Sequence, residues 1–228
     1  LYLLLLTPLA LVFRTPDGLV WAAFILNVAL YGVGVWLFAK VARHLFDGRY
    51  VYFVPCYNGS AFHGQFLRLD PDKDFQSTNA WMVFDPGAHG VGNDPDGYSY
   101  AAFDGRYIYF GPYHNGTAYH GEVLRYDTTG DFGAPSAWLA FDPGANGVGN
   151  DPDGYPGVVF DGRYVYFAPF NNGTDYHGEV MRYDTAGAFD VVDSWATFDA
   201  AAEGIGEDPT GYCGAIFDGR FIIFVPMA

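Results

Sequence analysis

The residues best suited to chemistry are carboxylates and amides gathered in three related loops. The first two loops read Gly-Asn-Asp-Pro-Asp-Gly, at 92–97 and 149–154, and the third reads Gly-Glu-Asp-Pro-Thr-Gly at 206–211. Such oxygen ligands beside a glycine turn suit a hard cation, and calcium takes about 6 to 8 of them. The residues of this predicted calcium site are Asn93, Asp94, Asp96, Asn150, Asp151, Asp153, Glu207 and Asp208.

The same loops also fit ordinary turns, which is the interpretation that the sequence favours. Asp-Pro-Asp-Gly is a turn string in which Asp caps its own backbone. No bidentate Glu follows at the spacing of a helix-loop-helix calcium site, and the third loop carries Thr210 where the others carry Asp. Calcium therefore stands as the alternative to a turn, and no other cofactor is indicated.

Histidine and asparagine form a second recurring set. Three of the six histidines recur at a spacing of 57 residues, each followed by Gly, and an Asn-Gly-Thr string precedes two of these three. A ring of imidazoles could bind a metal or an acidic ligand, but histidines in separate repeats would lie far apart. We expect hydrogen-bonded structural histidines on a face that also carries any ligand. The residues assigned to this ligand face are His63, His120, His177, Asn115 and Asn172.

A repeat of 57 residues must position these loops. Phe-Asp-Gly-Arg begins at Phe46, Phe103, Phe160 and Phe217. Self-similarity at such a period indicates units that cannot bury their apolar faces alone. Alternating, β-branched and aromatic residues in the third unit predict strands at 155–160, 163–168, 178–184 and 194–198. Asp161-Gly162 predicts a tight hairpin between the first two, with the following Arg on a strand and bonding to a neighbouring unit.

Four short antiparallel strands per unit are typical of a β-propeller blade, and Trp81, Trp138 and Trp195 recur on the last strand. In this fold the loop between the second and third strands and the loop between blades share one face. The segments 157–167 and 178–185, followed by Trp195, resemble the kelch repeat family. The resemblance covers 46–226 and is that of a bacterial-type variant, because Ala168-Pro169 and its equivalents replace the kelch glycine pair. It implies an all-β chain of four-stranded, propeller-like blades.

The domain organisation follows from the repeat. A membrane segment is predicted at 1–45, and the repeat units at 46–102, 103–159 and 160–216, with a partial unit at 217–228. Propellers close with roughly 4 to 8 blades, so we expect further repeats in the intact protein or a ring completed by several chains. Open blade edges predict self-association.

The first 45 residues predict a membrane anchor. Residues 19–39 carry no charge, and at about 1.5 Å per residue they span a hydrocarbon core of about 30 Å. Residues 1–13 fit the tail of an earlier span, while a cleaved signal peptide lacks its basic start and cleavage site. The basic residues that flank this segment favour a cytoplasmic location of the repeats. Three Asn-Gly-Ser/Thr triplets, which have the pattern of N-glycosylation acceptors, allow the opposite side of the membrane. The abrupt junction at 43–45 also leaves open whether head and repeats share one natural reading frame.

Composition narrows the function. Eleven Lys and Arg against 26 Asp and Glu give a formal charge of −15, which argues against nucleic acid as a partner. Cys56 and Cys213 occupy non-equivalent points of the repeat, which predicts two unpaired thiols. No nucleophile and base pair, phosphate loop or zinc spacing assigns a catalytic residue. We therefore expect a binding or scaffolding module for protein or carbohydrate. The alternative is a carbohydrate-active or other hydrolytic propeller enzyme with bound calcium.

Overall fold

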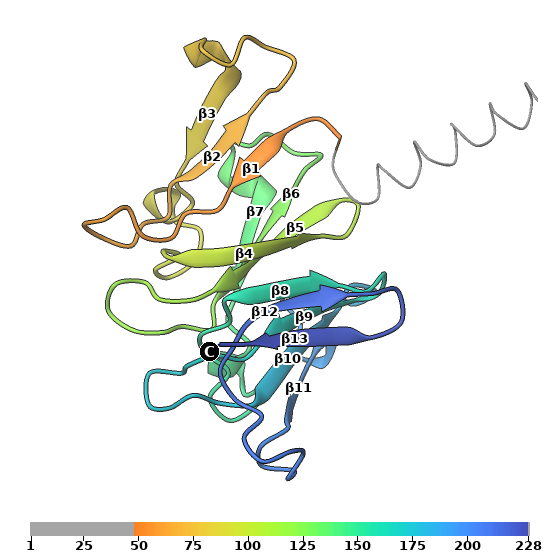
Figure 1. Ribbon diagram of the computed structural model, residues 1–228. Coiled ribbons are helices and arrows are strands. Elements are labelled where there is room, and N and C mark those ends of the chain that lie inside the picture. Colours follow the sequence, from red (N-terminus) through yellow and green to blue (C-terminus); the bar gives the residue numbers. More distant parts are fainter. Residues whose placement is uncertain (1–47, 228) are drawn as a thin grey trace, which may run out of the picture. The chain divides into compact units, whose positions relative to one another are not determined.

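The computed structural model describes residues 48–227, and over this range the protein is all-β. Its strands form four antiparallel sheets of two to four strands each (Figure 1). The predicted membrane helix at 19–39 and the apolar segment at 1–13 lie outside the described residues. Between residues 48 and 227, no helix has the length and apolar character needed to cross a membrane.

Each sheet is a meander in which strands adjacent in sequence pair with one another. The first sheet consists of β1 (Val51–Phe53), β2 (Phe66–Leu69) and β3 (Trp81–Phe84). The second consists of β4 (Tyr98–Phe103), β5 (Tyr107–Pro112), β6 (Val123–Asp127) and β7 (Trp138–Phe141). The third consists of β8 (Gly157–Phe160), β9 (Tyr164–Ala168), β10 (Glu179–Asp184) and β11 (Trp195–Asp199). The fourth consists of β12 (Tyr212–Phe217) and β13 (Ile222–Pro226).

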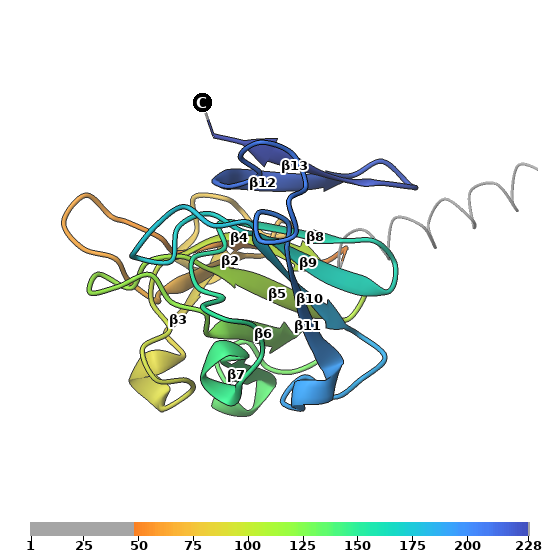
Figure 2. The same cartoon turned by 90° about the horizontal axis from the view of Figure 1, so that it is seen from below.

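Helical structure in the described residues is limited to single 3-10 turns of three residues each. These are η1 (Thr78–Ala80), η2 (Gly87–His89), η3 (Pro135–Ala137), η4 (Gly144–Asn146) and η5 (Val192–Ser194). Three of them directly precede the last strand of a sheet, on the side opposite to β4, β8 and β12 (Figure 2). The four strands predicted for the third unit are all present, with small differences at their ends.

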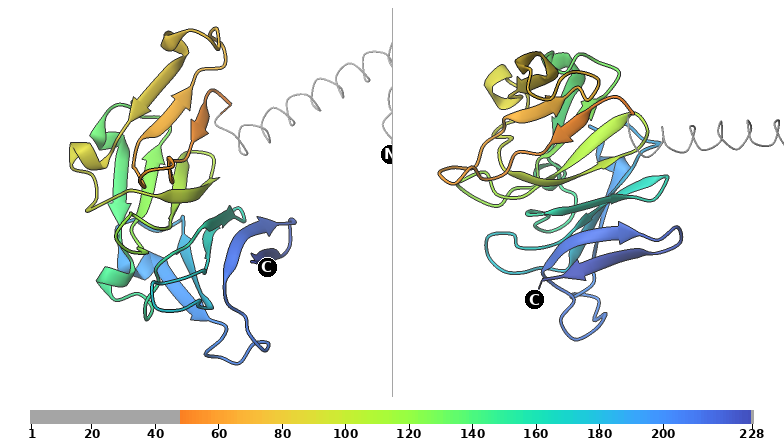
Figure 3. Two further views of the ribbon diagram at one scale, coloured as in Figure 1. Left: turned by 60° about the vertical axis from the view of Figure 1, so that its left-hand side comes forward. Right: turned by 45° about the horizontal axis from the view of Figure 1, so that its top comes forward.

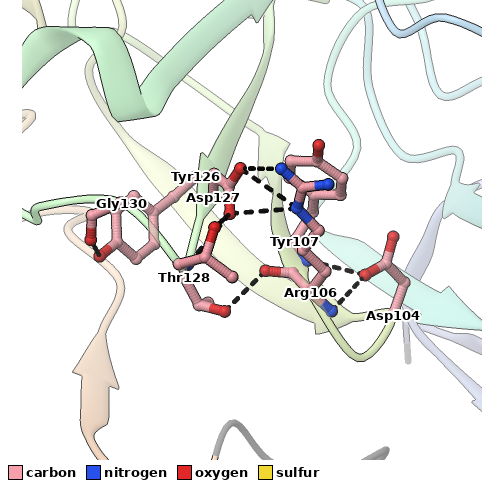
Figure 4. A network of polar contacts seen from close by, with 8 residues as sticks. Asp104, Arg106, Tyr107, Tyr126, Asp127, Thr128 and Gly130 are labelled. Atoms are coloured by element: carbon pink, nitrogen blue, oxygen red, sulfur yellow. Dashed lines mark hydrogen bonds and ion pairs between the residues drawn. The ribbon is translucent and has the colours of Figure 1, made fainter.

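A network around the Asp-Gly hairpin explains why Asp and Arg recur together (Figure 4). In the second sheet, the Asp104 carboxylate accepts the backbone N–H of Arg106 at 2.8 Å and of Tyr107 at 2.7 Å. The Arg106 guanidinium pairs with Asp127 at 2.7 Å, and Thr128 donates its hydroxyl to the Arg106 carbonyl at 2.7 Å. The hairpin predicted at Asp161-Gly162 is confirmed, since β8 pairs with β9 and Asp161 accepts the equivalent backbone N–H groups. The ion pair of Arg106, however, joins the β4–β5 turn to β6 of the same sheet, so the expectation that this Arg lies on a strand and bonds a neighbouring unit is wrong for Arg106.

The hydrophobic core lies between consecutive sheets rather than within one of them. Figure 3 shows how the sheets follow one another in the order of the chain. One buried cluster joins Phe66 and Phe84 of the first sheet to Phe110 and Trp138 of the second. The other joins the second sheet to the third. Strand β5 has five of its six residues buried, because both of its faces pack against other parts of the protein. Each sheet therefore shields its neighbour's apolar surface from water.

Three residues hold matching positions in each of the first three sheets, and we call them the triad; in the second and third sheets they lie in the buried clusters between sheets. The triads are Leu69, Phe75 and Trp81 in the first sheet, Tyr126, Phe132 and Trp138 in the second, and Tyr183, Phe189 and Trp195 in the third. Their polar atoms are satisfied locally, because each Trp indole N–H donates to the carbonyl of the triad Phe at 2.8–3.0 Å. The ring faces thus remain free to pack on the preceding sheet.

The triads predict a strong contrast between equivalent residues. Phe132 is fully buried, whereas Phe75 is 65% exposed. We expect Phe132→Ala to lower the free energy of unfolding by about 3–5 kcal/mol, because it removes packing and leaves a cavity. Phe75→Ala should change it by less than about 0.5 kcal/mol. Urea unfolding of the full chain in detergent micelles, followed by circular dichroism, measures both; equal losses would contradict the packing described above.

Candidate functional site

Two sets of loops come together on one side of the sheets, which we call the loop face. One set connects the second and third strands of the first three sheets, and the other connects consecutive sheets. The loops of the first set extend to the left in Figure 1. Backbone bonds join the sets: Gly97 N donates to the His63 carbonyl at 3.2 Å, and Gly154 N to the His120 carbonyl at 3.0 Å. The loop face is therefore a continuous hydrogen-bonded surface rather than separate turns.

Two of the predicted histidines brace this surface. His120 Nε2 lies 3.0 Å from the Asp96 carbonyl oxygen, and His177 Nε2 lies 2.9 Å from that of Asp153. A carbonyl oxygen can only accept, so Nε2 carries a proton in both rings. Burial lowers the pKa of His120 to about 4 and also lowers the pKa of His177, which favours neutral rings with Nδ1 unprotonated. His63 differs, since its Nδ1 accepts the Gln65 N–H at 3.3 Å. The hydrogen bonds expected of these histidines are present for His120 and His177.

The glycine after each histidine is required by the close approach of the next loop. A Cβ on Gly121 would lie 2.6 Å from the Pro152 carbonyl oxygen and 2.6 Å from Asp153 Oδ1. Gly64 and Gly178 are confined in the same way, by the carbonyls of Pro95 and Pro209. The recurring His-Gly pair thus marks the contact between the two sets of loops.

Two glutamates clamp the Asn-Asp-Pro-Asp loops from the following sheet. Glu122 accepts the Asn93 N–H at 2.9 Å, and Glu179 accepts the Asn150 N–H at 2.8 Å and the Asp151 N–H at 3.1 Å. Burial raises the pKa of Glu122, an effect that the backbone donors partly offset. These bonds hold the backbone of the predicted calcium loops through their N–H groups, not through their side-chain oxygens.

The carboxylates of these loops retain an unusual environment. Asp153 is half-buried, and burial together with Asp151 and Asp142 raises its pKa to about 7. Burial and Asp94 also raise the pKa of Asp96. Within residues 48–227, no three His, Cys, Asp or Glu side chains are placed to hold a metal ion. The calcium site therefore stays a prediction.

The remaining predicted residues lie where turns require them. Asn115 Oδ1 accepts the N–H groups of Thr117 and Ala118, both at 2.9 Å, and Asn172 makes the equivalent bonds. These asparagines therefore form turns on the loop face. In the third inter-sheet loop, Glu207 is exposed and Asp208 accepts the Thr210 hydroxyl at 2.8 Å.

The two cysteines are both free thiols, as predicted. Cys56 Sγ lies 3.8 Å from the Ser99 hydroxyl, and Cys213 Sγ lies 3.6 Å from the Val225 carbonyl oxygen. Neither thiol contributes to the loop contacts described above.

Six aromatic side chains run across the loop face, and we call them the aromatic row. In order they are Tyr57, Phe62, Tyr113, Tyr119, Phe170 and Tyr176. Successive ring centroids are 5.1–6.4 Å apart, so the row passes without a break from the first sheet to the third. Its ends are open to solvent, since Tyr57 and Tyr176 are each 56% exposed.

Reasoning from the sequence missed the glutamate clamp and the aromatic row. Both had a weak signal: Glu follows His-Gly in two units, and residues five apart flank each Asn-Gly turn. These flanking residues pair as isolated bridges, Tyr57 with Phe62, His114 with Tyr119 and Asn171 with Tyr176. An aromatic residue recurs at the second position of each bridge, and this recurrence builds the row.

Comparison with known proteins adds no relative to this picture. No protein-family model matches the chain, and no curated protein matches it.

The buried His120 predicts a pH dependence of stability. Its folded pKa of about 4 lies below the usual 6.5, so the unfolded chain binds its proton more tightly. This contribution is fully present above pH 6.5 and is lost progressively as the pH falls from 6.5 to about 4, amounting to about 3 kcal/mol.

The variant His120→Gln tests this contribution, because its amide can keep the bond to the Asp96 carbonyl without titrating. The difference in unfolding free energy between wild type and variant, measured from pH 7 to pH 4, isolates His120 from Asp153, whose raised pKa acts in the opposite direction. A difference that stays constant with pH would contradict the assignment.

Proposed function

We propose that this chain is a binding or scaffolding module built from kelch-like β-propeller blades and attached to a membrane by its first 45 residues. Four-stranded meanders packed face to face support the propeller reading, as does the gathering of both loop sets on one side. The loop face is the binding surface. Its ligand is a carbohydrate or a protein, and the aromatic row favours a carbohydrate.

The aromatic row is the observation that carries this proposal. Aromatic faces carry partial negative charge, so they attract the C–H groups on the apolar face of a sugar ring. Five of the six rings are at least partly exposed and offer several such positions along one chain of sugars, whereas Phe170 is buried and joins its neighbours from below. Turn asparagines beside the row supply polar contacts.

The rigidity of the loop face favours binding. The histidine, glutamate and glycine contacts fix the loops before any ligand arrives, which lowers the entropy lost on association. The net charge of −15 further favours a neutral ligand over an acidic one.

Substitutions in the row provide the test. The full chain in detergent micelles is titrated with a panel of β-linked glucose, xylose and N-acetylglucosamine hexasaccharides, and binding is followed by calorimetry. We expect binding of at least one oligosaccharide, weakened about 10-fold by Tyr119→Ala because one stacked ring is lost. Tyr176→Ala should act in the same direction.

The matched control is Tyr100→Ala, a residue 54% exposed on β4 and outside the row. It should leave binding unchanged. Equal loss in the control, or no binding of any oligosaccharide, would remove the carbohydrate and leave a protein ligand as the surviving form of the proposal.

Asp153 supports a second candidate, a hydrolytic enzyme acting on carbohydrate with bound calcium. A carboxyl group with a pKa of about 7 can donate a proton at neutral pH, and Asp142 and Asp151 lie near it. A hydrolase would release reducing ends from the bound hexasaccharide, and the rate would fall as the pH rises through about 7.

For this candidate, Asp153→Asn should lower the rate by about 100-fold or more while binding persists. Calcium at millimolar concentration should raise the melting temperature relative to chelator. An unchanged melting curve removes the calcium, and the absence of reducing ends from wild type removes the hydrolase, without affecting the binding proposal.

A further inference from the structure

The charged side chains of the described residues are divided between the two ends of the strands. The six loops of the loop face contain eleven Asp and Glu but no Lys or Arg; they are 54–65, 85–97, 113–122, 142–156, 169–178 and 200–211. The eight Lys and Arg of residues 48–227 all lie on strands, in the Asp-Gly-Arg turns or in the loop before a last strand. The loop face is therefore acidic and has no Lys or Arg of its own to neutralise it.

Two carboxylates from one inter-sheet loop converge on Gly121. A Cβ on this glycine would lie 2.6 Å from Asp153 Oδ1 and 3.5 Å from Asp142 Oδ1. Asp142 accepts the Ala145 N–H at 2.9 Å, whereas no donor among the described residues bonds to the Asp153 carboxylate. Burial, Asp151 and Asp142 all raise the pKa of Asp153, and no neighbouring cation acts against them. The charge of these two carboxylates is thus left uncompensated.

The 57-residue repeat reproduces this arrangement in the preceding loop. A Cβ on Gly64 would lie 2.6 Å from Asp96 Oδ1 and 3.5 Å from Asp85 Oδ1. Burial, Asp94 and Asp85 raise the pKa of Asp96, an effect that His63 partly offsets. The two sets are named the acid pairs, and they are Asp85 with Asp96 and Asp142 with Asp153.

Each acid pair lies beside one ring of the aromatic row. A Cβ on Gly154, the residue that follows the second acid pair, would lie 3.0 Å from Tyr119 Cδ1. A Cβ on Gly97, which follows the first acid pair, would lie 2.9 Å from Phe62 Cδ1. Both rings are partly exposed, and each contacts a ring of the next sheet. A ligand stacked on either ring therefore lies next to two carboxylates.

A ligand that satisfies both features has an apolar face and a positive charge close to it. The face of an aromatic ring attracts C–H groups and cations, and carboxylates form strong hydrogen bonds with an ammonium group. A glucosamine ring meets both needs, because its ammonium group is attached directly to the sugar ring. A basic peptide meets the charge alone at a higher cost, since long Lys and Arg side chains lose rotamer freedom on binding.

We propose that the loop face binds a β-linked polymer of glucosamine, whose rings stack on Phe62 and Tyr119 and whose ammonium groups bind the acid pairs. This inference rests on the carbohydrate binding proposed above and names the class of sugar. Neutral sugars use the stacking alone, and acidic sugars are repelled by the carboxylates.

Two matched oligosaccharides isolate the charge. The β-linked hexasaccharides of glucosamine and of N-acetylglucosamine share ring and linkage, but acetylation removes the positive charge. Each is titrated by calorimetry into the full chain in micelles of an uncharged detergent at pH 6.5. We expect the glucosamine hexasaccharide to bind about 10-fold tighter or more, because charged hydrogen bonds are added to the stacking. This preference should shrink as salt is raised from about 0.05 M to about 0.5 M, because salt screens the attraction.

A double variant removes one charge from each acid pair. Asp96→Asn with Asp153→Asn keeps the size of both side chains, and no hydrogen bond among the described residues depends on their carboxylates. The preference for glucosamine should disappear, while affinity for the acetylated sugar stays that of wild type. The melting temperature should not fall, because repulsion between carboxylates is relieved.

The matched control is Asp72→Asn with Asp190→Asn, two exposed residues in the loops before β3 and β11, at the other end of the strands. It changes the net charge equally and should keep the preference of wild type. Equal affinity of wild type for both sugars, a preference that survives in the double variant, or an equal loss in the control would overturn the proposal and leave the binding of neutral carbohydrate standing.

Two further outcomes separate this proposal from the function on which it rests. Binding of neither hexasaccharide would overturn it, and the other sugars of the panel then decide whether any carbohydrate binds. A hexalysine peptide that binds as tightly as the glucosamine hexasaccharide would also overturn it, and would assign the acid pairs to a basic protein segment.

Discussion

The burial of aromatic faces between consecutive sheets is the interaction on which the rest of this structure depends. A single sheet of four short strands cannot hide both of its apolar faces, so each relies on the next. The triad answers this need with rings whose polar atoms are already satisfied, since Tyr183 donates its hydroxyl to the Gly187 carbonyl at 2.8 Å and Trp195 its indole N–H to Phe189. The ring faces of these residues need no further polar partner and pack on the neighbouring sheet.

Sheet packing also fixes the loop face. Because the triads set the separation of the sheets, the loop that leaves one sheet meets the loop of the next at a constant distance. Only glycine fits at positions such as Gly121, and His120 and Glu122 on either side reach the preceding loop. The aromatic row is continuous for the same reason, since Tyr113 and Tyr119 lie within contact of Phe170 only when the sheets are stacked.

The periodic features of this fold could be predicted from the sequence because they are local. Alternation predicted the strands of the third unit, Asp161-Gly162 predicted the hairpin, and the recurring Trp predicted the last strand of each of the first three sheets. The contacts of the loop face could not be predicted in the same way, because they join residues far apart in the sequence. Glu179 and Asn150 are 29 residues apart, and their bond uses a backbone N–H that no side-chain pattern reports. The sequence of these loops predicts calcium ligands because it contains carboxylates, whereas the backbone N–H groups that Glu122 and Glu179 bind cannot be read from residue types.

The loop face and the apolar groove beside Phe198 use different parts of the same sheets. The loop face is built where strands end, whereas Tyr166, Arg182 and Phe198 line the groove along the strands β9, β10 and β11. None of these three side chains belongs to the aromatic row or to the hydrogen bonds that join the two sets of loops. The two surfaces can therefore be altered separately, because a substitution in the groove leaves the contacts of the loop face in place.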